Sequence, residues 1–303
     1  MILMKIPFLK KGDTIAIATP SRKAGLSDFE LFENYLAERG FKTVRAGNIF
    51  LSDNQFAGND SSRIEAMNNL IEDKKIKAIV AVRGGYGAVR IVDKLNWDTL
   101  SKNPKWLCGF SDFTVLLNHN FAHNRLPAIH SDMAVHYGLK EYESNFEKLI
   151  DLLIGKPLEL CFSSHPLNKY GEAEGVIVGG NLSVMYSLLA SKSFPDTKGK
   201  ILFLEDLDEY LYHIDRMIVG LKRAKVFDGV AGVVVGSFSE MRDNEISFGK
   251  NAEEIIYEHL SEFSFPLIFG FPAGHTSKNH PFYIGAETKI KTRKDISEFR
   301  QHL

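Results

Sequence analysis

Ser111 stands in a segment whose residue types suit a nucleophile. The segment reads Gly109-Phe110-Ser111-Asp112 and follows a short apolar run that predicts a strand. A serine at a tight turn between a strand and a helix is held out of the fold, and the backbone N–H of the next residue can face a developing oxyanion. The match to the Gly-x-Ser-x-Gly elbow is incomplete, because Phe113 occupies the last glycine position. The alternative is that Ser111 or Asp112 only caps the following helix.

A serine nucleophile needs a base and a group that orients the base. His275 lies in a Gly-His loop directly after an apolar strand-like run, which is a common position for a catalytic base. Glu205 closes the apolar run 200–204, where a carboxylate is either paired or functional because burying a lone charge is costly. The acidic residues that crowd the next positions leave a capping or ion-pair role open for this group: Asp206, Asp208, Glu209 and Asp215.

Two glycine-rich segments could bring backbone N–H groups close to a substrate, because glycine has no Cβ. The first reads Arg83-Gly84-Gly85-Tyr86-Gly87. It is not a dinucleotide loop, since Arg90 stands where the third glycine of that motif would be. The second, Gly179-Gly180-Asn181, is equally well explained as a plain turn between a strand and a helix.

No metal site is expected from the spacing of possible ligands. His119 and His123 are four residues apart on one predicted helix face, but Asn120 stands where the zinc-peptidase motif has its glutamate. Neither Cys108 nor Cys161 has a cysteine partner at ligand spacing, and two cysteines form no disulfide framework. Such cysteine usage suits a reducing compartment.

The elements that must position these residues alternate along the chain. The first half predicts strands at 14–18, 41–46, 77–82 and 106–109 and helices at 28–39, 61–73, about 88–95 and 113–123. Such alternation favours an α/β fold with a parallel sheet covered by helices on both faces. The second half predicts strands at 175–178, 201–204, 230–235 and 267–269, helices at 182–190, 210–224 and 252–260, and a more mixed sheet near 281–290. We therefore expect two α/β domains, 1–155 and 171–303, joined by a linker at 156–170.

Composition excludes several classes of protein. The 303 residues carry 37 Lys and Arg against 38 Asp and Glu, which argues against a nucleic-acid partner. The longest uncharged run, 175–191, is too short and too polar for a membrane span. At the N-terminus the basic residues Lys10 and Lys11 follow the apolar stretch, the reverse of a signal peptide, so we expect a cytoplasmic protein.

Five motifs taken in order closely resemble the LD-carboxypeptidase (muramoyltetrapeptide carboxypeptidase) family of serine peptidases. The resemblance runs from about Gly12 to Ile290, and its motifs are 83–87, 109–112, 179–181, 204–216 and 274–275. It implies two domains, with a nucleophile in the N-terminal one and the acid and base in the C-terminal one. The implied triad is Ser111, Glu205 and His275. The chain departs from the family's pattern at Leu211, where many members have proline, and at 281–285. These departures concern substrate preference more than catalysis.

The resemblance also implies an activity. The expected reaction is metal-independent and cofactor-free release of terminal D-alanine from a murein tetrapeptide recovered in cell-wall turnover, by a homodimer. We expect the oxyanion hole at the backbone N–H groups of Asp112 and Gly85, and substrate contacts from Arg83 and Tyr86. Alternatives are a microcin-immunity type of peptidase that cleaves acyl-adenylate toxins with the same triad, or a non-catalytic α/β binding protein. A catalytic site between the two domains would bring Ser111 and His275 together across a cleft.

Overall fold

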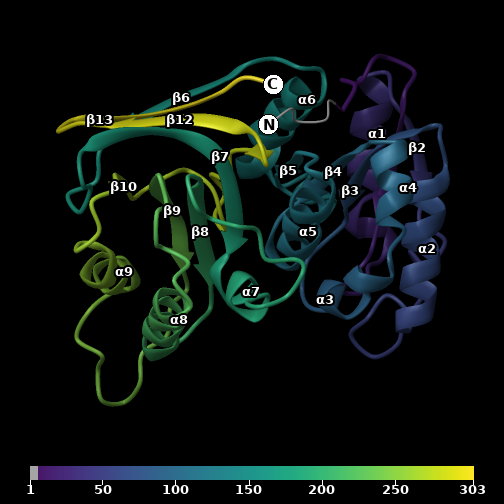
Figure 1. Ribbon diagram of the computed structural model, residues 1–303. Coiled ribbons are helices and arrows are strands. Elements are labelled where there is room, and N and C mark those ends of the chain that lie inside the picture. The colour runs from purple at the N-terminus through teal and green to yellow at the C-terminus, as the bar shows by residue number, and fades with distance from the viewer. Residues whose placement is uncertain (1–5) are drawn as a thin grey trace.

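Two β-sheets organise the protein, and each half of the chain supplies most of one sheet (Figure 1). The computed structural model describes residues 6–303. The expectation that the chain lacks an export signal uses its N-terminal stretch, which begins outside these residues. Within residues 6–303, no helix combines the length and apolar character that a membrane crossing requires.

The first sheet has six strands in the order β11-β5-β4-β3-β1-β2. Its strands are parallel except β11, which pairs antiparallel with β5. Strands β1 and β3 are almost wholly buried apolar runs, as expected for strands covered on both faces. The bounds are β1 (Thr14–Ala18), β2 (Lys42–Arg45), β3 (Ile76–Ala81), β4 (Trp106–Gly109), β5 (Ala128–His130) and β11 (Phe282–Ile284).

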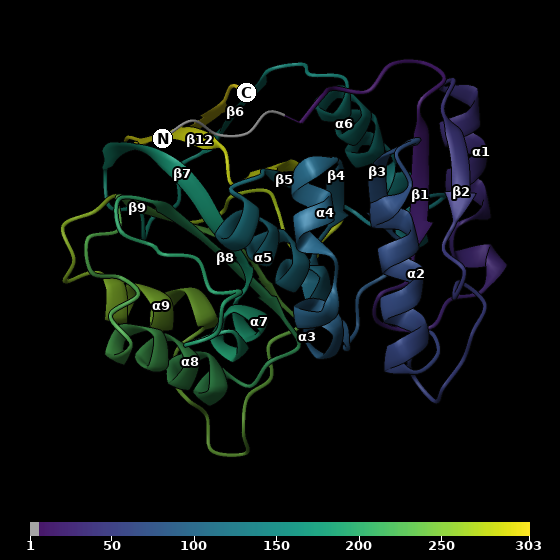
Figure 2. The ribbon, with the colours of Figure 1, turned by 45° about the vertical axis from the view of Figure 1, so that its right-hand side comes forward.

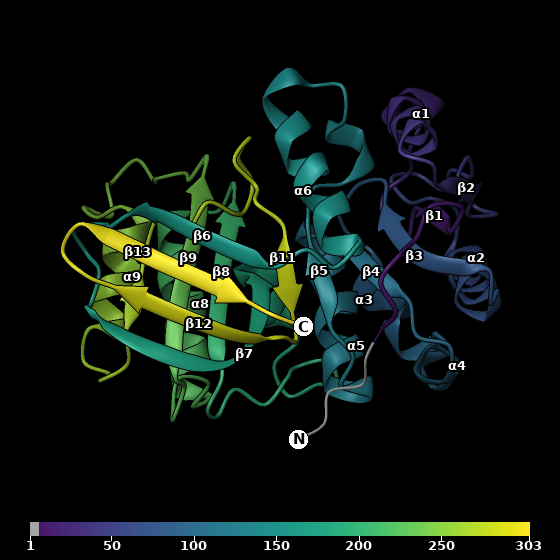
Figure 3. The same cartoon turned by 90° about the horizontal axis from the view of Figure 1, so that it is seen from above.

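The second sheet has seven strands in the order β10-β9-β8-β7-β12-β13-β6 and is mixed. Strands β7 to β10 are parallel, whereas β12, β13 and β6 continue the sheet with antiparallel pairs and lie across the parallel strands (Figures 1 and 3). The long strand β7 joins the two parts. The bounds are β6 (Leu158–Ser163), β7 (Gly171–Asn181), β8 (Ile201–Leu207), β9 (Gly232–Ser239), β10 (Leu267–Ile268), β12 (Glu287–Thr292) and β13 (Ile296–Gln301).

Helices cover these sheets by burying apolar stripes. In α8 the buried residues Ile214, Met217, Ile218 and Leu221 follow helical spacing and pack on the second sheet's core. The α-helices of the described chain are α1 (Glu30–Glu38), α2 (Asp60–Glu72), α3 (Ala88–Ile91), α4 (Trp97–Lys102), α5 (Thr114–Asn124), α6 (Glu143–Leu153), α7 (Leu182–Ser187), α8 (Leu211–Arg223) and α9 (Ala252–Leu260).

The α/β fold class and the parallel first sheet are confirmed, and two details differ from the sequence prediction. The stretch 156–170, predicted as a linker, contains β6, which pairs with β13 at the edge of the second sheet. Its alternation of inward Leu158 and Leu160 with exposed Glu159 and Cys161 is a strand pattern, but its partner strand is far away in sequence. In addition, β11 comes from the second half and completes the first sheet beside β5.

The two halves meet along α5, the helix that follows Ser111. Asn118 on α5 exchanges two hydrogen bonds with the backbone of Gly179 in β7, at 2.9 and 3.0 Å. A Cβ added to Gly180 would lie 2.6 Å from Oγ1 of Thr114, so glycine is needed here for α5 to approach β7. The 179–181 segment is therefore explained by helix packing. Helix α5 also contacts α7 at this junction (Figure 2).

Candidate active site

Ser111 occupies a sharp turn at the carboxyl end of β4. It opens the 3₁₀ turn Ser111–Phe113, which leads directly into α5. Its φ of 58° lies in the left-handed region, which is uncommon for a residue with a side chain and is typical of strained positions at functional sites. Gly84 faces this turn: a Cβ at Gly84 would lie 2.9 Å from Ser111 Oγ and 3.5 Å from the backbone nitrogen of Asp112. The absence of a side chain at Gly84 leaves room next to both groups.

The carboxylate of Asp112 holds the neighbouring loops against this turn. It is buried, and its Oδ2 accepts hydrogen bonds from Ser21 Oγ at 2.5 Å and from the backbone N–H of Ala88 at 2.8 Å. Burial raises the pKa of Asp112, and these two hydrogen bonds oppose that shift. Because Ala88 is the first residue of α3, Asp112 caps α3 and not the helix that follows it in sequence.

Glu205 and His275 form a hydrogen-bonded pair beside the nucleophile turn. Nδ1 of His275 lies 2.7 Å from Oε2 of Glu205. A carboxylate accepts, so Nδ1–H donates and Nε2 carries the free lone pair of the neutral ring. The ring centroid of Phe110, the residue before Ser111, lies 4.6 Å from that of the imidazole. The structure therefore brings the segment of Ser111 into contact with the predicted base, although these residues come from different halves of the chain.

Burial and charge act in opposite directions on His275. Burial lowers the pKa of the imidazole, but the charge of Glu205 and its hydrogen bond, followed by the charges of Asp206 and Asp132, raise it above its ordinary value overall. Glu205 itself is fully buried within β8, which continues past it to Leu207. A Cβ at Gly274 would lie 2.9 Å from Oε2 of Glu205, so glycine before His275 permits this close approach.

The other acidic residues after β8 have local partners. Asp206 is buried and accepts hydrogen bonds from the backbone of Ser183 and Leu207 and from Asn181, while burial and then the charge of Glu205 raise its pKa to about 7. The remaining pairs are Asp208 with Arg242, Glu209 with His213, and Asp215 with His259. Glu205 thus differs from its neighbours, because its partner is His275, whose ring contacts Phe110 next to Ser111.

The 83–87 loop follows β3 and lines the same edge of the first sheet. Arg83 lies 3.6 Å from Asp28 and is partly exposed, and Tyr86 is about half exposed. Gly85 has a φ of 105°, and a Cβ there would lie 2.9 Å from Cβ of Arg22. Arg22 was not among the predicted site residues, although its place just after β1 in a parallel sheet is a signal for one.

The histidine pair of α5 lies apart from these residues. Nδ1 of His119 is 2.8 Å from Ser193 Oγ, and its ring stacks on Trp97 with centroids 4.5 Å apart. Burial lowers the pKa of His119 to about 4. Nε2 of His123 is 3.3 Å from Asp98. Within the part of the chain that the structure describes, no three His, Cys, Asp or Glu side chains are placed to share a metal ion.

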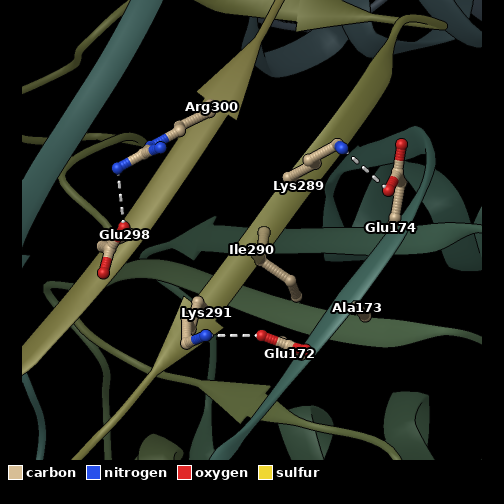
Figure 4. A pocket seen from close by; sticks show the side chains of 8 residues that line it. All are labelled: Glu172, Ala173, Glu174, Lys289, Ile290, Lys291, Glu298 and Arg300. Atoms are coloured by element: carbon tan, nitrogen blue, oxygen red, sulfur yellow. Dashed lines mark hydrogen bonds and ion pairs between the residues drawn. The ribbon is translucent and has the colours of Figure 1, made fainter.

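A shallow hollow on the outer face of the second sheet contains none of the predicted site residues (Figure 4). It crosses β7, β12 and β13, and its charged side chains are matched in pairs. The ion pairs are Lys291 with Glu172, Lys289 with Glu174, and Arg300 with Glu298. This face has the character of a solvated sheet surface.

Known proteins resemble both halves of the chain. Residues 15–131 match the LD-carboxypeptidase N-terminal domain, and residues 174–290 match the LD-carboxypeptidase C-terminal domain. A probable murein peptide carboxypeptidase of Bacillus subtilis is 29% identical over 94% of this chain and 90% of its own length. The murein tetrapeptide carboxypeptidase of Pseudomonas aeruginosa is 30% identical over 76% of this chain and 77% of its own.

Solved structures share the fold over nearly the whole chain. The crystal structure of a muramoyltetrapeptide carboxypeptidase from Oxalobacter formigenes matches with a TM-score of 0.86, covers 96% of this chain and 99% of its own, and is 24% identical. A MccF-like protein from Bacillus anthracis matches with a TM-score of 0.84 at 26% identity, covering 97% and 98% of the two chains.

Proposed function

The chain belongs to the LD-carboxypeptidase family, and from that premise we propose that it is a serine carboxypeptidase that releases terminal D-alanine from murein tetrapeptides. The observation that carries the proposal is the buried Glu205–His275 pair in contact with the segment of Ser111. The names of the relatives from Bacillus subtilis and Pseudomonas aeruginosa support murein peptide as the substrate class.

In the proposed reaction, Ser111 Oγ attacks the carbonyl carbon of the bond to D-alanine, and its proton passes to Nε2 of His275. Glu205 holds Nδ1–H and stabilises the imidazolium that forms. The backbone N–H groups of Asp112 and Gly85 would donate to the oxyanion of the tetrahedral intermediate. The imidazolium then protonates the leaving amine, the C–N bond breaks, and water attacks the acyl-serine by the reverse sequence of proton transfers.

Substrate contacts are proposed at the 83–87 loop. Arg83 would bind the carboxylate of D-alanine, since guanidinium groups pair well with carboxylates and its contact with Asp28 is long at 3.6 Å. The exposed ring of Tyr86 would pack against the peptide. We further propose that the enzyme acts as a homodimer on murein fragments recovered in the cytoplasm.

A second candidate is a microcin-immunity type of peptidase. The similarity to the MccF-like protein of Bacillus anthracis supports it, because the same nucleophile and base could cleave the acyl bond of an acyl-adenylate. The murein peptide relatives, which match over most of their lengths, favour the first candidate.

The test is release of D-alanine from muramoyl tetrapeptide, with an aminoacyl sulfamoyl adenosine as the competing substrate. Ser111→Ala and His275→Ala should each abolish D-alanine release and leave the melting temperature nearly unchanged, because removing a nucleophile or base costs about 10⁶-fold in kcat. Activity should survive EDTA and phenanthroline. More than about a tenth of the wild-type rate in Ser111→Ala would exclude a serine nucleophile.

A further inference from the structure

Asn279 fastens the loop that carries His275. Its side chain is fully buried, and its Oδ1 accepts a hydrogen bond from the backbone N–H of Gly274 at 2.9 Å. Its Nδ2 donates to Oδ1 of Asp132 at 3.0 Å. Because Gly274 immediately precedes His275, this amide fixes the backbone next to the imidazole.

Asp132 anchors the loop to the first half of the chain. It is buried two residues after β5, and its Oδ1 also accepts a hydrogen bond from Nδ1 of His136 at 3.1 Å. Its Oδ2 accepts a bond from Nδ2 of Asn145 on α6 at 2.5 Å, and Asn145 also donates to the backbone oxygen of Ser277 at 2.9 Å. The groups from the other half therefore hold the loop after His275, at Ser277 and Asn279, and the Asn279 amide links this anchor to Gly274, before His275.

The carboxylate of Asp132 also decides which way the Asn279 amide faces. A carboxylate only accepts, so Nδ2 of Asn279 must face Asp132 and Oδ1 must face Gly274. The same Oδ1 lies 3.0 Å from Nε2 of His130, so His130 carries its proton on Nε2. In agreement, Nδ1 of His130 is buried with no hydrogen-bond partner among residues 6–303.

We propose that Asp132 and Asn279 are positioning residues for the hydrolysis, which hold the backbone of Gly274 and His275 so that the imidazole stays bonded to Glu205 and faces the turn of Ser111. This inference rests on the proposed function. Displacement of a catalytic base by about 1 Å lowers the rate on the order of a hundredfold. Buried hydrogen bonds that fix the loop therefore support the rate by preventing such a displacement.

Asp132 also contributes charge at the imidazole. The titratable groups that face His275 are Glu205 and Asp206 from β8, Asp132 from the end of β5, and the buried His130. Among these, Asp132 helps to raise the pKa of His275, after the larger contributions of Glu205 and Asp206. Replacing Asp132 by asparagine should lower that pKa. It should also weaken the hold on the loop, because one of the two acceptor oxygens becomes an NH2 group that faces another donor.

Kinetics of Asn279→Ala and Asp132→Asn test the inference, with Asn124→Ala as the matched control. Asn124 is a buried asparagine that donates to the backbone oxygen of Trp97 and to Asn120, at the other end of α5 from Ser111. We expect kcat for D-alanine release to fall at least about tenfold in both variants with KM within about twofold, and to stay within about twofold of wild type in the control. The rising limb of the pH–rate profile should move to lower pH in Asp132→Asn. Should Asn279→Ala fail to fold, Asp132→Asn still tests the inference, because asparagine keeps the shape of the side chain. Unchanged kcat in Asp132→Asn overturns the inference.

A second readout needs no substrate. ¹⁵N NMR of labelled histidine should show His275 protonated on Nδ1 in the wild type, and altered ¹⁵N shifts and a lower pKa of His275 in Asp132→Asn. Unaltered His275 signals in that variant contradict the positioning role. If the wild type releases no D-alanine and these signals nevertheless change, the proposed function fails and the positioning role stands.

Discussion

Two hydrogen-bonded pairs of a carboxylate and a basic group have nearly equal lengths and opposite surroundings. Glu205 and His275 lie 2.7 Å apart, with side chains that are 0% and 13% exposed. Lys291 and Glu172, on the outer face of the second sheet, lie 2.6 Å apart, with side chains that are 37% and 71% exposed. The first pair joins β8 to a loop that contacts Phe110, whereas the second joins β12 to β7 on the outer face of the second sheet (Figure 4).

The difference shows that burial, and not distance, separates a candidate catalytic pair from a surface pair. In water the attraction between charges is weak and is screened by salt, so exposed pairs contribute little. Inside the protein the same attraction is strong, and a group left without its partner is costly. Glu205 can therefore orient His275 and raise its pKa, and the outer pairs cannot exert comparable control.

Within this comparison of the two pairs, the largest expected effect follows from removing the charge of the buried pair. Glu205→Gln keeps the shape of the side chain but no longer stabilises the imidazolium, so kcat for D-alanine release should fall by about 10⁴-fold, as for the orienting acid of other serine enzymes. The control is Glu174→Gln, which alters an exposed carboxylate and should leave kcat within about twofold. Retention of a tenth of the activity in Glu205→Gln would mean that its burial beside His275 has no catalytic role.

The next effect concerns close packing at the buried site. Gly84→Ala would place a methyl group 2.9 Å from Ser111 Oγ in the present geometry, so the serine must shift. We expect a loss of about a hundredfold in kcat, the cost of a misplacement near 1 Å. Gly47→Ala is the matched control, because nothing lies within 4 Å of a Cβ at that position. Equal activities of the two variants would contradict the placement of Gly84 against the nucleophile.

A third prediction uses a buried histidine that has no carboxylate partner. Burial lowers the pKa of His119 from 6.5 to about 4, the opposite of the net shift at His275. The unfolded chain therefore takes up a proton before the folded one as pH falls below 6.5, and stability is lost on acidification. From pH 7 to pH 5 this loss should be about 2 kcal/mol for His119.

Urea unfolding of the wild type and His119→Phe at both pH values measures this loss. Phenylalanine keeps a ring beside Trp97 but does not titrate. The free energy of unfolding of the wild type minus that of His119→Phe should therefore fall on acidification. A difference independent of pH would show that His119 is not held neutral.

The smallest effect is expected on the outer face of the second sheet. Lys289→Ala, Glu174→Ala and the double variant form a cycle around an ion pair whose side chains are 66% and 59% exposed. Thermal unfolding should give a coupling that is indistinguishable from zero, because such pairs are solvated and mobile. A coupling comparable with that of a buried pair would mean that this surface is covered by another molecule in solution.

Much of the first sheet and its helices could be predicted from local patterns. Buried apolar runs such as 14–18 and 76–81, separated by amphipathic helices, are typical of parallel strands. Strand β5 and helix α6 were not among the predicted elements. Strand β6 was missed because its alternation becomes meaningful only when β13 lies beside it.

The candidate triad shows the same division between local and distant information. Ser111, Glu205 and His275 could each be selected from residue type and position after a predicted apolar run, although β8 continues past Glu205. The left-handed backbone of Ser111 and the burial of Glu205 are properties of the folded chain. Arg22 and the Asp132–Asn279 hydrogen bond were missed, because each acts through a residue distant in sequence.

By itself the sequence determined the α/β class, the ordered motifs of the family and the residue types available for an acid, a base and a nucleophile, because these depend on local composition and spacing. Only the tertiary structure decided that Glu205 is buried against His275, that Phe110 brings the nucleophile turn to the imidazole, and that Asp132 holds the loop through Asn279. These contacts join segments from different sheets. Their strength comes from the exclusion of water, which exists only after the two halves have packed together.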